Sequence, residues 1–500
     1  MKTVKKQHII IIIILLIVLF FSPLKIFSQS WEPLGDPFVG TENARLGFQS
    51  SLSADGNHLA IGAYLDATQA NEGGAVYTYQ WDGNAWQPYG TPLYGQAEDR
   101  FGTRVALDED GDTLIVSAPE SNIAGKQRGY VQVYKLIANT WTPSGIFYGE
   151  FDNDRLGLKS VDVNLAGDII AIGSWNHDTP TLTDAGRVQV FQLLDPLWVP
   201  MGQQIIGFQN QMYLGAVTLS GSGMRMVVGA IGYDENTIQD IGILYVLEYN
   251  GSLWEQIFST TGDIELERFG LSIDLDEAGK TFVVSSSQHT QNVPGRVKVF
   301  KEVTPNNWQQ IGNTIIGNIG EGFGYDVAIN ASGNAFVFSA PDFLNVNATG
   351  SVYSYQYNGS VYEPYLDPIV GSLGYSIGYG LSLNANGNRL VVGAPNADII
   401  ILNEGWVQVY EAPILGINAF QDERNVTISP NPFVDSFTVS MLEELIGAKM
   451  ELVDATGKKI NSNIPLNQIT TNVNVELTSG IYFLNLKLDG KTMTKKIIKH

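Results

Sequence analysis

The chain of 500 residues contains no cysteine, few charged side chains and only five histidines. Without cysteine it forms neither a disulfide nor a thiolate metal site, and it has no cysteine for an N-terminal lipid anchor. Charged residues make up 16% of the chain, whereas glycine (53), tyrosine (22) and phenylalanine (22) are abundant. This mixture is typical of short strands joined by tight turns. The chain is too long for one ordinary core, so we expect at least two folded parts.

Basic residues are scarce in the middle of the chain. Residues 31–413 hold 16 basic and 42 acidic residues, a net charge of −26, whereas residues 414–500 are neutral. A surface of this sign repels nucleic acid and anionic lipid and attracts cations or basic partners. We therefore expect no nucleic-acid partner. The alternative interpretation of the acidity is that it simply keeps an exported protein in solution.

The longest apolar run lies near the N-terminus. Three lysines precede thirteen apolar residues, Ile9–Phe21. Since a membrane-spanning helix needs about 20 apolar residues, this run predicts a signal peptide over residues 1–28, cut between Ser28 and Gln29. An uncleaved anchor is the alternative. We expect no membrane span in the mature chain.

The chain repeats itself seven times between residues 31 and 413. One aromatic residue recurs at intervals of 54–57 residues: Trp31, Trp86, Trp141, Trp198, Trp254, Trp308 and Tyr362. Each unit also has an apolar-glycine pair, a short turn ending in glycine, a pair of small residues and an alternating strand such as GYVQVY (129–134). These elements predict four antiparallel strands per unit. Seven such units predict an all-β fold, a seven-bladed β-propeller, with another all-β array as the alternative.

The phase of the repeat predicts how the ring of units closes. The chain enters on a lone tryptophan strand at 31–40 and leaves after a third strand at 405–410. Pairing of these two segments would complete the seventh unit from both ends. It would also cover an exposed strand edge.

The repeat resembles the FG-GAP repeat of integrin-α-type propellers. The resemblance is closest where FG at 101–102 is followed by SAP at 117–119. The family often binds calcium in a D-x-D-x-D-G-x-x-D loop, and only Asp108, Asp110 and Asp112 approach that pattern here. We therefore expect no metal and no other cofactor, with this one loop as the calcium candidate.

Polar residues recur in the loop before the apolar-glycine pair. Three units have an acid-arginine pair there and a fourth has a lone arginine: Arg45, Asp99, Arg100, Asp154, Arg155, Glu267 and Arg268. Because these positions are equivalent in the repeat, the residues are expected to ring one face of the propeller. They form a candidate binding rim for a polar ligand or a cation. The alternative is that each arginine pairs with a nearby acid and joins neighbouring units.

Residues suited to catalysis are scarce in the repeat region. Its three histidines, His58, His177 and His289, lie at unequal positions, and no catalytic-triad order or metal-ligand spacing is present. We predict no catalytic residue and no enzyme. The alternative is a carbohydrate-active enzyme with two carboxylates facing each other across the axis, as in glycosidases.

Residues 425–500 follow a linker at 414–424 and no longer show the repeat. Segments 436–441, 449–453, 472–476, 481–488 and 492–498 predict a small, immunoglobulin-like β-sandwich. The module resembles the type A sorting domain of the type IX secretion system. The matching residues are Pro430, Asn431, Pro432, Phe433, Gly457, Gly480, Tyr482, Lys495 and Lys496.

This resemblance implies that the type IX secretion machinery is a partner and carries the chain across an outer membrane. With the signal peptide, it predicts passage through the periplasm to a secreted or cell-surface location. We expect a monomeric binding or adhesion protein whose propeller face recognises a glycan, a peptide or another surface partner. The carbohydrate-active enzyme and a structural surface component remain the alternatives.

Overall fold

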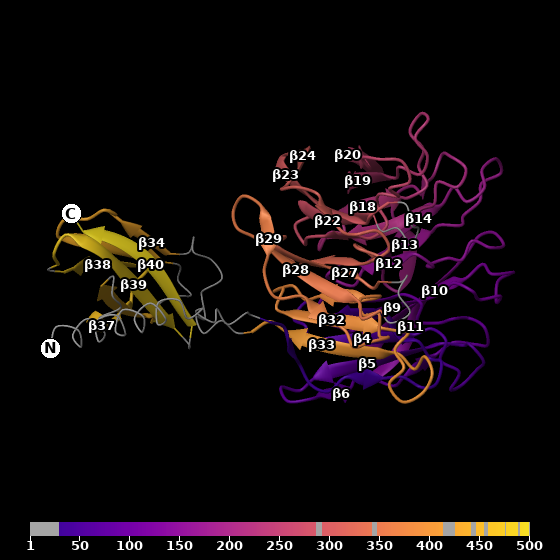
Figure 1. Ribbon diagram of the computed structural model, residues 1–500, viewed down its shortest axis with the longest axis horizontal. Helices are drawn as coiled ribbons and strands as arrows, with labels where there is room; N and C mark the ends of the chain where they lie inside the picture. The colour runs from indigo at the N-terminus through magenta and orange to yellow at the C-terminus, as the bar shows by residue number, and fades with distance from the viewer. Residues whose placement is uncertain are drawn as a thin grey trace, which may run out of the picture. The chain divides into compact units, whose positions relative to one another are not determined.

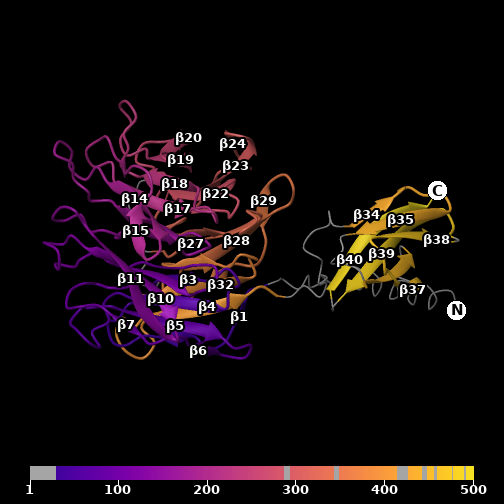
Figure 2. The same ribbon diagram turned by 180° about the vertical axis from the view of Figure 1, so that it is seen from behind.

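The computed structural model describes residues 30–286, 293–342, 348–413, 426–441, 447–454, 459–475, 477–488 and 491–499. These residues form strands and turns but no helix, which confirms the all-β class, and none belongs to a helix that could cross a bilayer. The chain divides into two compact units, Met1–Ala412 and Pro413–His500 (Figures 1 and 2). The predicted signal peptide, with Ser28 and Gln29, and the predicted linker lie outside the described residues, as does His289.

The described part of the first unit contains seven antiparallel sheets, here called sheets 1 to 7, with the same internal strand order. The inner strands are β3 (Leu46–Leu52), β8 (Val105–Leu107), β12 (Ser160–Val163), β17 (Leu214–Leu219), β21 (Ile273–Leu275), β26 (Val327–Ile329) and β31 (Leu381–Leu383). The second strands are β4 (His58–Ala63), β9 (Thr113–Ala118), β13 (Ile169–Ser174), β18 (Arg225–Ala230), β22 (Thr281–Ser286), β27 (Ala335–Ala340) and β32 (Arg389–Ala394).

The outer half of each sheet is formed by a long third strand and a fourth strand. The third strands are β5 (Ala75–Trp81), β10 (Tyr130–Ile137), β14 (Arg187–Leu194), β19 (Ile243–Tyr249), β23 (Arg296–Thr304), β28 (Ser351–Tyr357) and β33 (Trp406–Glu411). The fourth strands are β6 (Trp86–Pro88), β11 (Thr140–Tyr148), β15 (Leu197–Pro200), β20 (Trp254–Thr261), β24 (Asn307–Gln310), β29 (Tyr362–Pro364) and, in sheet 7, β1 (Glu32–Pro33). The predicted unit of four antiparallel strands is confirmed.

In five sheets the predicted fourth strand is broken in two. A second piece pairs with the third strand: β2 (Phe38–Val39), β7 (Leu93–Tyr94), β16 (Ile205–Ile206), β25 (Ile315–Ile316) and β30 (Ile369–Val370). In four of the five, a glycine with φ of 75–77° lies between the pieces: Gly35, Gly90, Gly202 and Gly312. A side chain would strain this left-handed conformation, so glycine is the residue that permits the break.

The second strands are buried on both faces. All six residues are buried in β9 (TLIVSA), β13 (IIAIGS) and β22 (TFVVSS). A strand that reads as a continuous apolar run needs cover on each face, and here both neighbouring sheets supply it. This packing explains why the repeat shows few charges.

Seven backbone hydrogen bonds join the turns between first and second strands into a closed ring. Each N–H donates to a carbonyl oxygen of the next sheet: Ala54 to Glu109 (3.2 Å), Glu109 to Leu165 (3.2 Å), Leu165 to Gly221 (3.1 Å), Gly221 to Glu277 (3.0 Å), Glu277 to Ala331 (3.2 Å), Ala331 to Ala385 (3.1 Å) and Ala385 to Ala54 (2.9 Å). The last bond returns to the first sheet. The sheets therefore surround a central axis, an arrangement that fits a β-propeller.

The two ends of the first unit meet in sheet 7. Both β1 and β2 pair with β33, so that Glu32 faces Glu411 and Phe38 faces Val407. The predicted closure is confirmed. In Figure 1 the late strands β32 and β33 lie beside β4, from the start of the unit, and Figure 2 also shows β32 beside β4.

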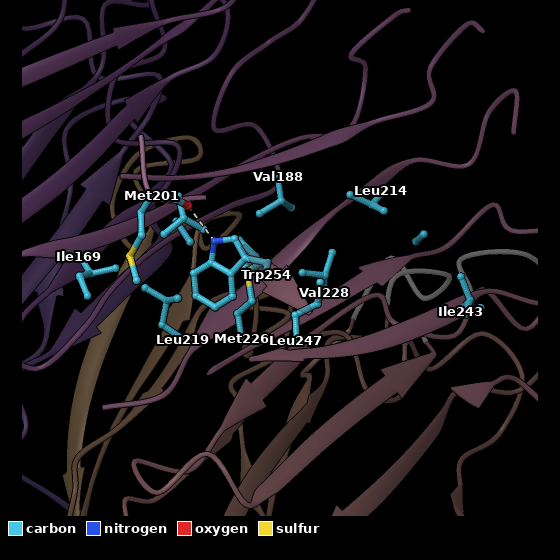
Figure 3. Packing of buried hydrophobic residues seen from close by; sticks show 14 of the residues in the cluster. Ile169, Val188, Met201, Leu214, Leu219, Met226, Val228, Ile243, Leu247 and Trp254 are labelled. Atoms are coloured by element: carbon cyan, nitrogen blue, oxygen red, sulfur yellow. Dashed lines mark hydrogen bonds between the residues drawn. The ribbon is translucent and has the colours of Figure 1, made fainter. Parts of the chain in front are cut away.

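In five of the seven sheets the recurring tryptophan donates a hydrogen bond to the preceding sheet. Trp254 is buried in an apolar cluster, and its indole N–H donates to the carbonyl oxygen of Met201 at 2.8 Å (Figure 3). Equivalent bonds to the preceding sheet run from Trp86 to Leu34, Trp141 to Thr78, Trp198 to Ser144 and Trp31 to Ser354. The strongest marker of the repeat is therefore a contact between sheets.

The second unit has two antiparallel sheets among its described residues, ordered β34-β35-β38 and β37-β36-β39-β40. The strands are β34 (Val426–Ser429), β35 (Ser436–Met441), β36 (Lys449–Asp454), β37 (Lys459–Pro465), β38 (Thr470–Asn474), β39 (Gly480–Leu488) and β40 (Lys491–Lys499). Phe437 and Val439 of the first sheet share one buried cluster with Leu452 and Leu484 of the second. The sequence missed β34 and β37, which are edge strands, and β37 opens with the polar segment KINSN.

Deletion of residues 31–40 is expected to lower the melting temperature of the first unit by on the order of 10 °C. The deletion removes the buried Trp31 and the strands β1 and β2, and it leaves one edge of β33 unpaired. Differential scanning calorimetry measures the effect, with deletion of residues 414–500 as the control. An unchanged melting temperature after the first deletion would contradict the closure.

Candidate functional site

The loops before the inner strands hold the predicted rim residues in a shared backbone conformation. Arg45, Arg100, Arg155 and Arg268 have φ values of 59°, 53°, 47° and 55°. Residues other than glycine adopt this left-handed region in only a few per cent of cases. Its recurrence in four sheets shows that these loops have equivalent backbone geometry.

The three acids beside these arginines are buried. Asp99 accepts hydrogen bonds from the Gln96 N–H (3.0 Å) and the Tyr130 hydroxyl (3.1 Å). Glu267 accepts from the N–H groups of Asp263 and Ile264 in its own loop. The carboxylates therefore stabilise the loops from inside and do not form a solvent-facing rim.

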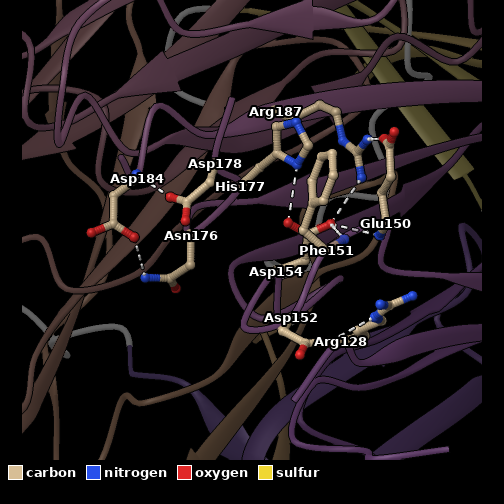
Figure 4. Close-up of polar contacts among 10 residues, drawn as sticks. All are labelled: Arg128, Glu150, Phe151, Asp152, Asp154, Asn176, His177, Asp178, Asp184 and Arg187. Carbon is tan, nitrogen blue, oxygen red and sulfur yellow. Dashed lines mark hydrogen bonds and ion pairs between the residues drawn. The ribbon is translucent and has the colours of Figure 1, made fainter. Parts of the chain in front are cut away.

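Asp154 lies in a polar network with His177, Arg187 and Glu150 (Figure 4). Its Oδ1 is 3.0 Å from Nδ1 of His177, and its Oδ2 is 3.4 Å from Nη2 of Arg187, which is only 2% exposed. The second guanidinium nitrogen of Arg187 lies 2.6 Å from Glu150 Oε2. Burial raises the pKa of Asp154, but hydrogen bonds from His177 and Phe151 and the charges of His177 and Arg187 outweigh it and hold that pKa below its usual value.

The residue that contacts the buried acid of each loop differs in type from sheet to sheet. The partner is always the residue after the glycine that opens the third strand: Tyr130 for Asp99, Arg187 for Asp154, Arg296 for Glu267 and, without an acid, Trp406 for Tyr375. In sheet 7 two aromatic rings, 5.9 Å apart, occupy the place of an ion pair. A position that accepts either pairing serves the packing of its loop.

The arginines of the predicted rim are half-exposed and pair with residues of neighbouring loops. Arg100 lies 3.3 Å from Glu72, and both Arg100 (3.9 Å) and Arg155 (3.5 Å) reach Glu120. Arg268 pairs with Asp240, and Arg45 donates to the amide oxygen of Asn396. This is the geometry of the alternative interpretation, in which each arginine pairs locally and joins neighbouring sheets.

Replacement of Arg187 by methionine is expected to lower the free energy of unfolding by about 3–5 kcal/mol, because it leaves Asp154 buried without its cation. Arg155→Met is the matched control. Its half-exposed pair with Glu120 contributes about 0–1 kcal/mol. Urea unfolding measures both variants, and equal effects would contradict the difference in role.

The calcium candidate at 108–112 is a hydrogen-bonded turn. Oδ1 of Asp108 accepts the N–H groups of Asp112 and Thr113, each at 3.0 Å. At the equivalent position the other sheets use Ser53, Asn164, Ser220, Asp276, Asn330 and Asn384 to accept the same backbone N–H. Uncharged residues thus do the same work. Within the described ranges, no group of three His, Asp or Glu side chains is placed to hold a metal.

A central channel runs between the inner strands and consists of two adjoining cavities of about 190 and 200 Å³. We call the end lined by Gln49, Arg104, Lys159, Ser272 and Asp326 the channel mouth. The other end is formed by the turns that carry the ring of backbone hydrogen bonds. Side chains from all seven sheets line the channel.

Three aspartates in the channel bind the free backbone edges of neighbouring sheets. Each accepts an N–H from the next inner strand: Asp162 from Leu219 (2.7 Å), Asp274 from Ile329 (2.7 Å) and Asp326 from Leu381 (2.9 Å). Inner strands lack a ladder partner on this side, so these bonds satisfy donors that would otherwise stay unpaired. The carboxylates are therefore occupied by structural hydrogen bonds.

Two cations lie at the channel mouth. Arg104 donates to Oε1 of Gln49 (2.7 Å) and to the carbonyl oxygen of Leu158 (3.2 Å). Nζ of Lys159 lies 5.2 Å from the ring centre of Trp175. Burial lowers the pKa of Lys159 to about 7, and the charge of Arg104 adds to this effect.

Four aromatic rings from sheets 1, 7 and 6 lie at the same end of the inner strands, and we call them the aromatic row. The ring centres of Tyr64 and Phe48 are 4.8 Å apart, those of Phe48 and Tyr379 6.3 Å, and those of Tyr379 and Tyr325 5.2 Å. The Arg104 guanidinium lies 5.3 Å from the centre of Phe48. The row and the two cations therefore adjoin one another.

This site could not be found from the repeat, because the residue type at its positions differs from unit to unit. Gln49, Arg104, Ser272 and Asp326 each stand three residues after the apolar residue of the apolar-glycine pair. The repeat is recognised by the residues that are the same in every unit. A position whose residue differs between units looks like an ordinary surface position. The usable signal was the strand alternation, which directs every second residue of an inner strand to the axis.

The channel aspartates make stability depend on pH. Burial raises the pKa of Asp162 to about 6 and that of Asp274 to about 7, partly offset by backbone hydrogen bonds. The folded state holds the proton of Asp274 more tightly than the unfolded state does, so this group favours folding fully below pH 3.8, the ordinary pKa of aspartate. That contribution is lost as the pH rises through the folded pKa of about 7.

We expect Asp274→Asn to raise the melting temperature at pH 8 by about 2 °C or more and to change it little at pH 4. Thermal melts at both pH values test this, with the exposed Asp36→Asn as the control; equal shifts in the two variants would contradict it.

Comparison with known families matches one segment in each of the two units. Residues 427–500 match the family described as a secretion system C-terminal sorting domain, and residues 91–134 match the FG-GAP repeat. The chain carries a sorting domain and an FG-GAP repeat. The sorting domain marks the protein for export, with release or attachment at the cell surface.

Most of the predicted sorting residues lie in the last two strands or contact the last one. Phe433 is fully buried, its N–H donates to the Ile498 carbonyl oxygen, and Oδ1 of Asn431 accepts the N–H of Ile498, both at 2.9 Å. Gly480 begins β39, and the hydroxyl of Tyr482 donates to the Thr478 carbonyl oxygen. Pro430 and Pro432 flank Asn431, and Lys495 and Lys496 belong to β40, whereas Gly457 lies outside the described residues.

Solved structures with a similar chain path include two putative 6-phosphogluconolactonases. The protein from Bacteroides uniformis is 16% identical with a TM-score of 0.45, over 65% of this chain and 86% of that chain. The one from Bacteroides fragilis is 14% identical with a TM-score of 0.44, over 65% and 85%. Likeness at this level carries no functional information. No curated protein matches the chain.

Proposed function

We propose that this protein is an exported binding protein whose channel mouth and aromatic row recognise a glycan outside the cell. The sorting domain supports the location. The aromatic row carries the proposal for the ligand, since four adjoining rings beside polar side chains can stack on the apolar faces of sugar rings. A signal peptide at residues 1–28 and a role in adhesion belong to the same proposal.

Binding is favoured over catalysis because of how the channel carboxylates are used. A glycosidase needs one carboxyl group free to donate a proton and another free to attack or to activate water. Asp162, Asp274 and Asp326 instead accept backbone N–H groups that hold the sheets together. The rim acids Asp99 and Glu267 are likewise bonded within their loops.

The predicted rim has a supporting part in this proposal. Arg45 donates to Asn396, whose side-chain amide in turn donates to the hydroxyl of Tyr379 at 2.7 Å. The rim arginine of sheet 1 thus positions one ring of the aromatic row. The remaining rim arginines join neighbouring loops.

A glycan array probed with the first unit tests the proposal, followed by a hydrolysis assay on every polymer that binds. We expect binding without the release of new reducing ends. Tyr64→Ala is expected to weaken binding about 5- to 10-fold, because it removes the first ring of the row. Tyr94→Ala, which changes an exposed tyrosine of β7, is the control and is expected to leave binding unchanged. Turnover of a bound polymer, or no binding to any glycan, would overturn the proposal.

A further inference from the structure

Arg104 and Lys159 are two cations without an acidic partner in the part of the chain that the structure describes. No carboxylate oxygen lies within 4 Å of either side chain among those residues, although most other arginines of the unit are ion-paired. The bonds of Arg104 go to the neutral oxygens of Gln49 and Leu158. Lys159 contacts the ring of Trp175.

The nearby Asp326 attracts both cations but forms an ion pair with neither. Its direct contacts are the hydroxyl of Ser272 at 2.8 Å and the N–H of Leu381 at 2.9 Å. Arg104 and Lys159 also repel each other. Keeping two partly buried like charges together costs free energy, and a bound anion would remove that cost. Buried charges that lack a partner in a cavity are candidates for ligand contacts.

The size of the cavity limits what enters it. About 190 Å³ is less than the roughly 300–1,000 Å³ of a pocket that takes a whole small molecule. One charged group or one small ring fits, and the rest of a longer ligand must lie outside, where the aromatic row begins. The planar guanidinium of Arg104 suits the two oxygens of a carboxylate.

We propose that the channel mouth binds the carboxylate of an acidic sugar, held by Arg104 and Lys159, while the aromatic row contacts the adjoining sugar ring. The proposal rests on the proposed function and names its ligand class. The net charge of −26 on residues 31–413 repels anions from the rest of the surface. Attraction at the mouth acts within the screening length of about 8–10 Å, so binding is confined to this site.

The test uses the full chain and pairs of polymers that differ only in charge. Alginate, polygalacturonate and hyaluronate are each compared with the same polymer after chemical reduction of its carboxyl groups to alcohols. We expect at least one acidic polymer to bind about tenfold more tightly than its reduced form, since a hydrogen bond to a carboxylate is stronger than one to the alcohol that replaces it. Isothermal titration calorimetry gives the dissociation constants.

Lys159→Met is expected to remove this preference, lowering affinity for the acidic polymer about tenfold and leaving the reduced polymer unaffected. Methionine keeps the apolar stem against Trp175, so folding should be preserved, and a thermal melt checks this. Lys301→Met is the matched control, since Lys301 lies over Tyr357 at 5.0 Å in an outer part of sheet 5. We expect it to bind as the unaltered chain does.

The pH dependence supplies a second readout that a purely structural lysine would not change. Lys159 loses its proton as the pH rises through about 7. Of the charged groups that face it, Arg104 stays protonated, and burial raises the pKa of Asp326 above its ordinary value. The loss of the Lys159 charge weakens the binding of an anion, so affinity should fall between pH 6 and pH 8.5, and less so in Lys159→Met.

The outcomes separate this inference from the proposed function. Equal binding of acidic and reduced polymers, with Lys159→Met unchanged and Tyr64→Ala weakened, would overturn the acidic-sugar inference and leave glycan binding in place. Failure of every polymer here and of every glycan on the array would overturn both. Loss of binding in Lys301→Met as well as Lys159→Met would also contradict a specific role for the mouth.

Discussion

The ring of seven backbone hydrogen bonds between neighbouring turns is the constraint on which the first unit depends. Each bond joins two sheets, and the set closes only because the turn at Ala385 returns to Ala54. The ring fixes the inner strands around the axis and so creates the channel. The aspartates of the channel and the recurring tryptophans then join the same sheets at two further radii.

The repeat divides its positions between structure and recognition. Constant positions, such as the tryptophan and the turn glycine, contact neighbouring sheets or permit the left-handed backbone. Positions that look functional by composition, such as Asp99 and Glu267, prove to stabilise loops. The positions that vary most along the inner strands face the axis, where Arg104 and Lys159 meet the aromatic row. The proposed binding site is thus built from side chains that the fold leaves free to change.

Much of the fold could be predicted because each unit repeats the same short sequence patterns. The spacing of Trp31 to Tyr362 predicted the sheets, and the phase of the repeat predicted the pairing of β1 with β33. The two edge strands of the second unit escaped because β34 is short and β37 is polar.

The site was harder to predict than the fold. Arginines with positive φ, such as Arg155, turn the preceding acid inward, and no propensity rule for arginine predicts that conformation. The channel mouth escaped because its residues come together only when separate sheets converge on the axis. Lys159 and Asp326, for example, are far apart in sequence and belong to different sheets, but both line the same cavity.

Pairing of β1 with β33 has a consequence for how the chain reaches its native state. Glu32 and Glu411 lie at opposite ends of the first unit in sequence, so this contact has almost the largest sequence separation that the unit allows. Contacts of this kind are expected to form late and slowly, because the chain loses the entropy of closing a long loop before the contact stabilises it. Until β33 is present, the inner strand of sheet 1 lacks one neighbouring sheet, and its apolar side chains stay open to other chains. Because the two paired strands lie at opposite ends of the unit, we expect the sheets to close into a ring late in folding.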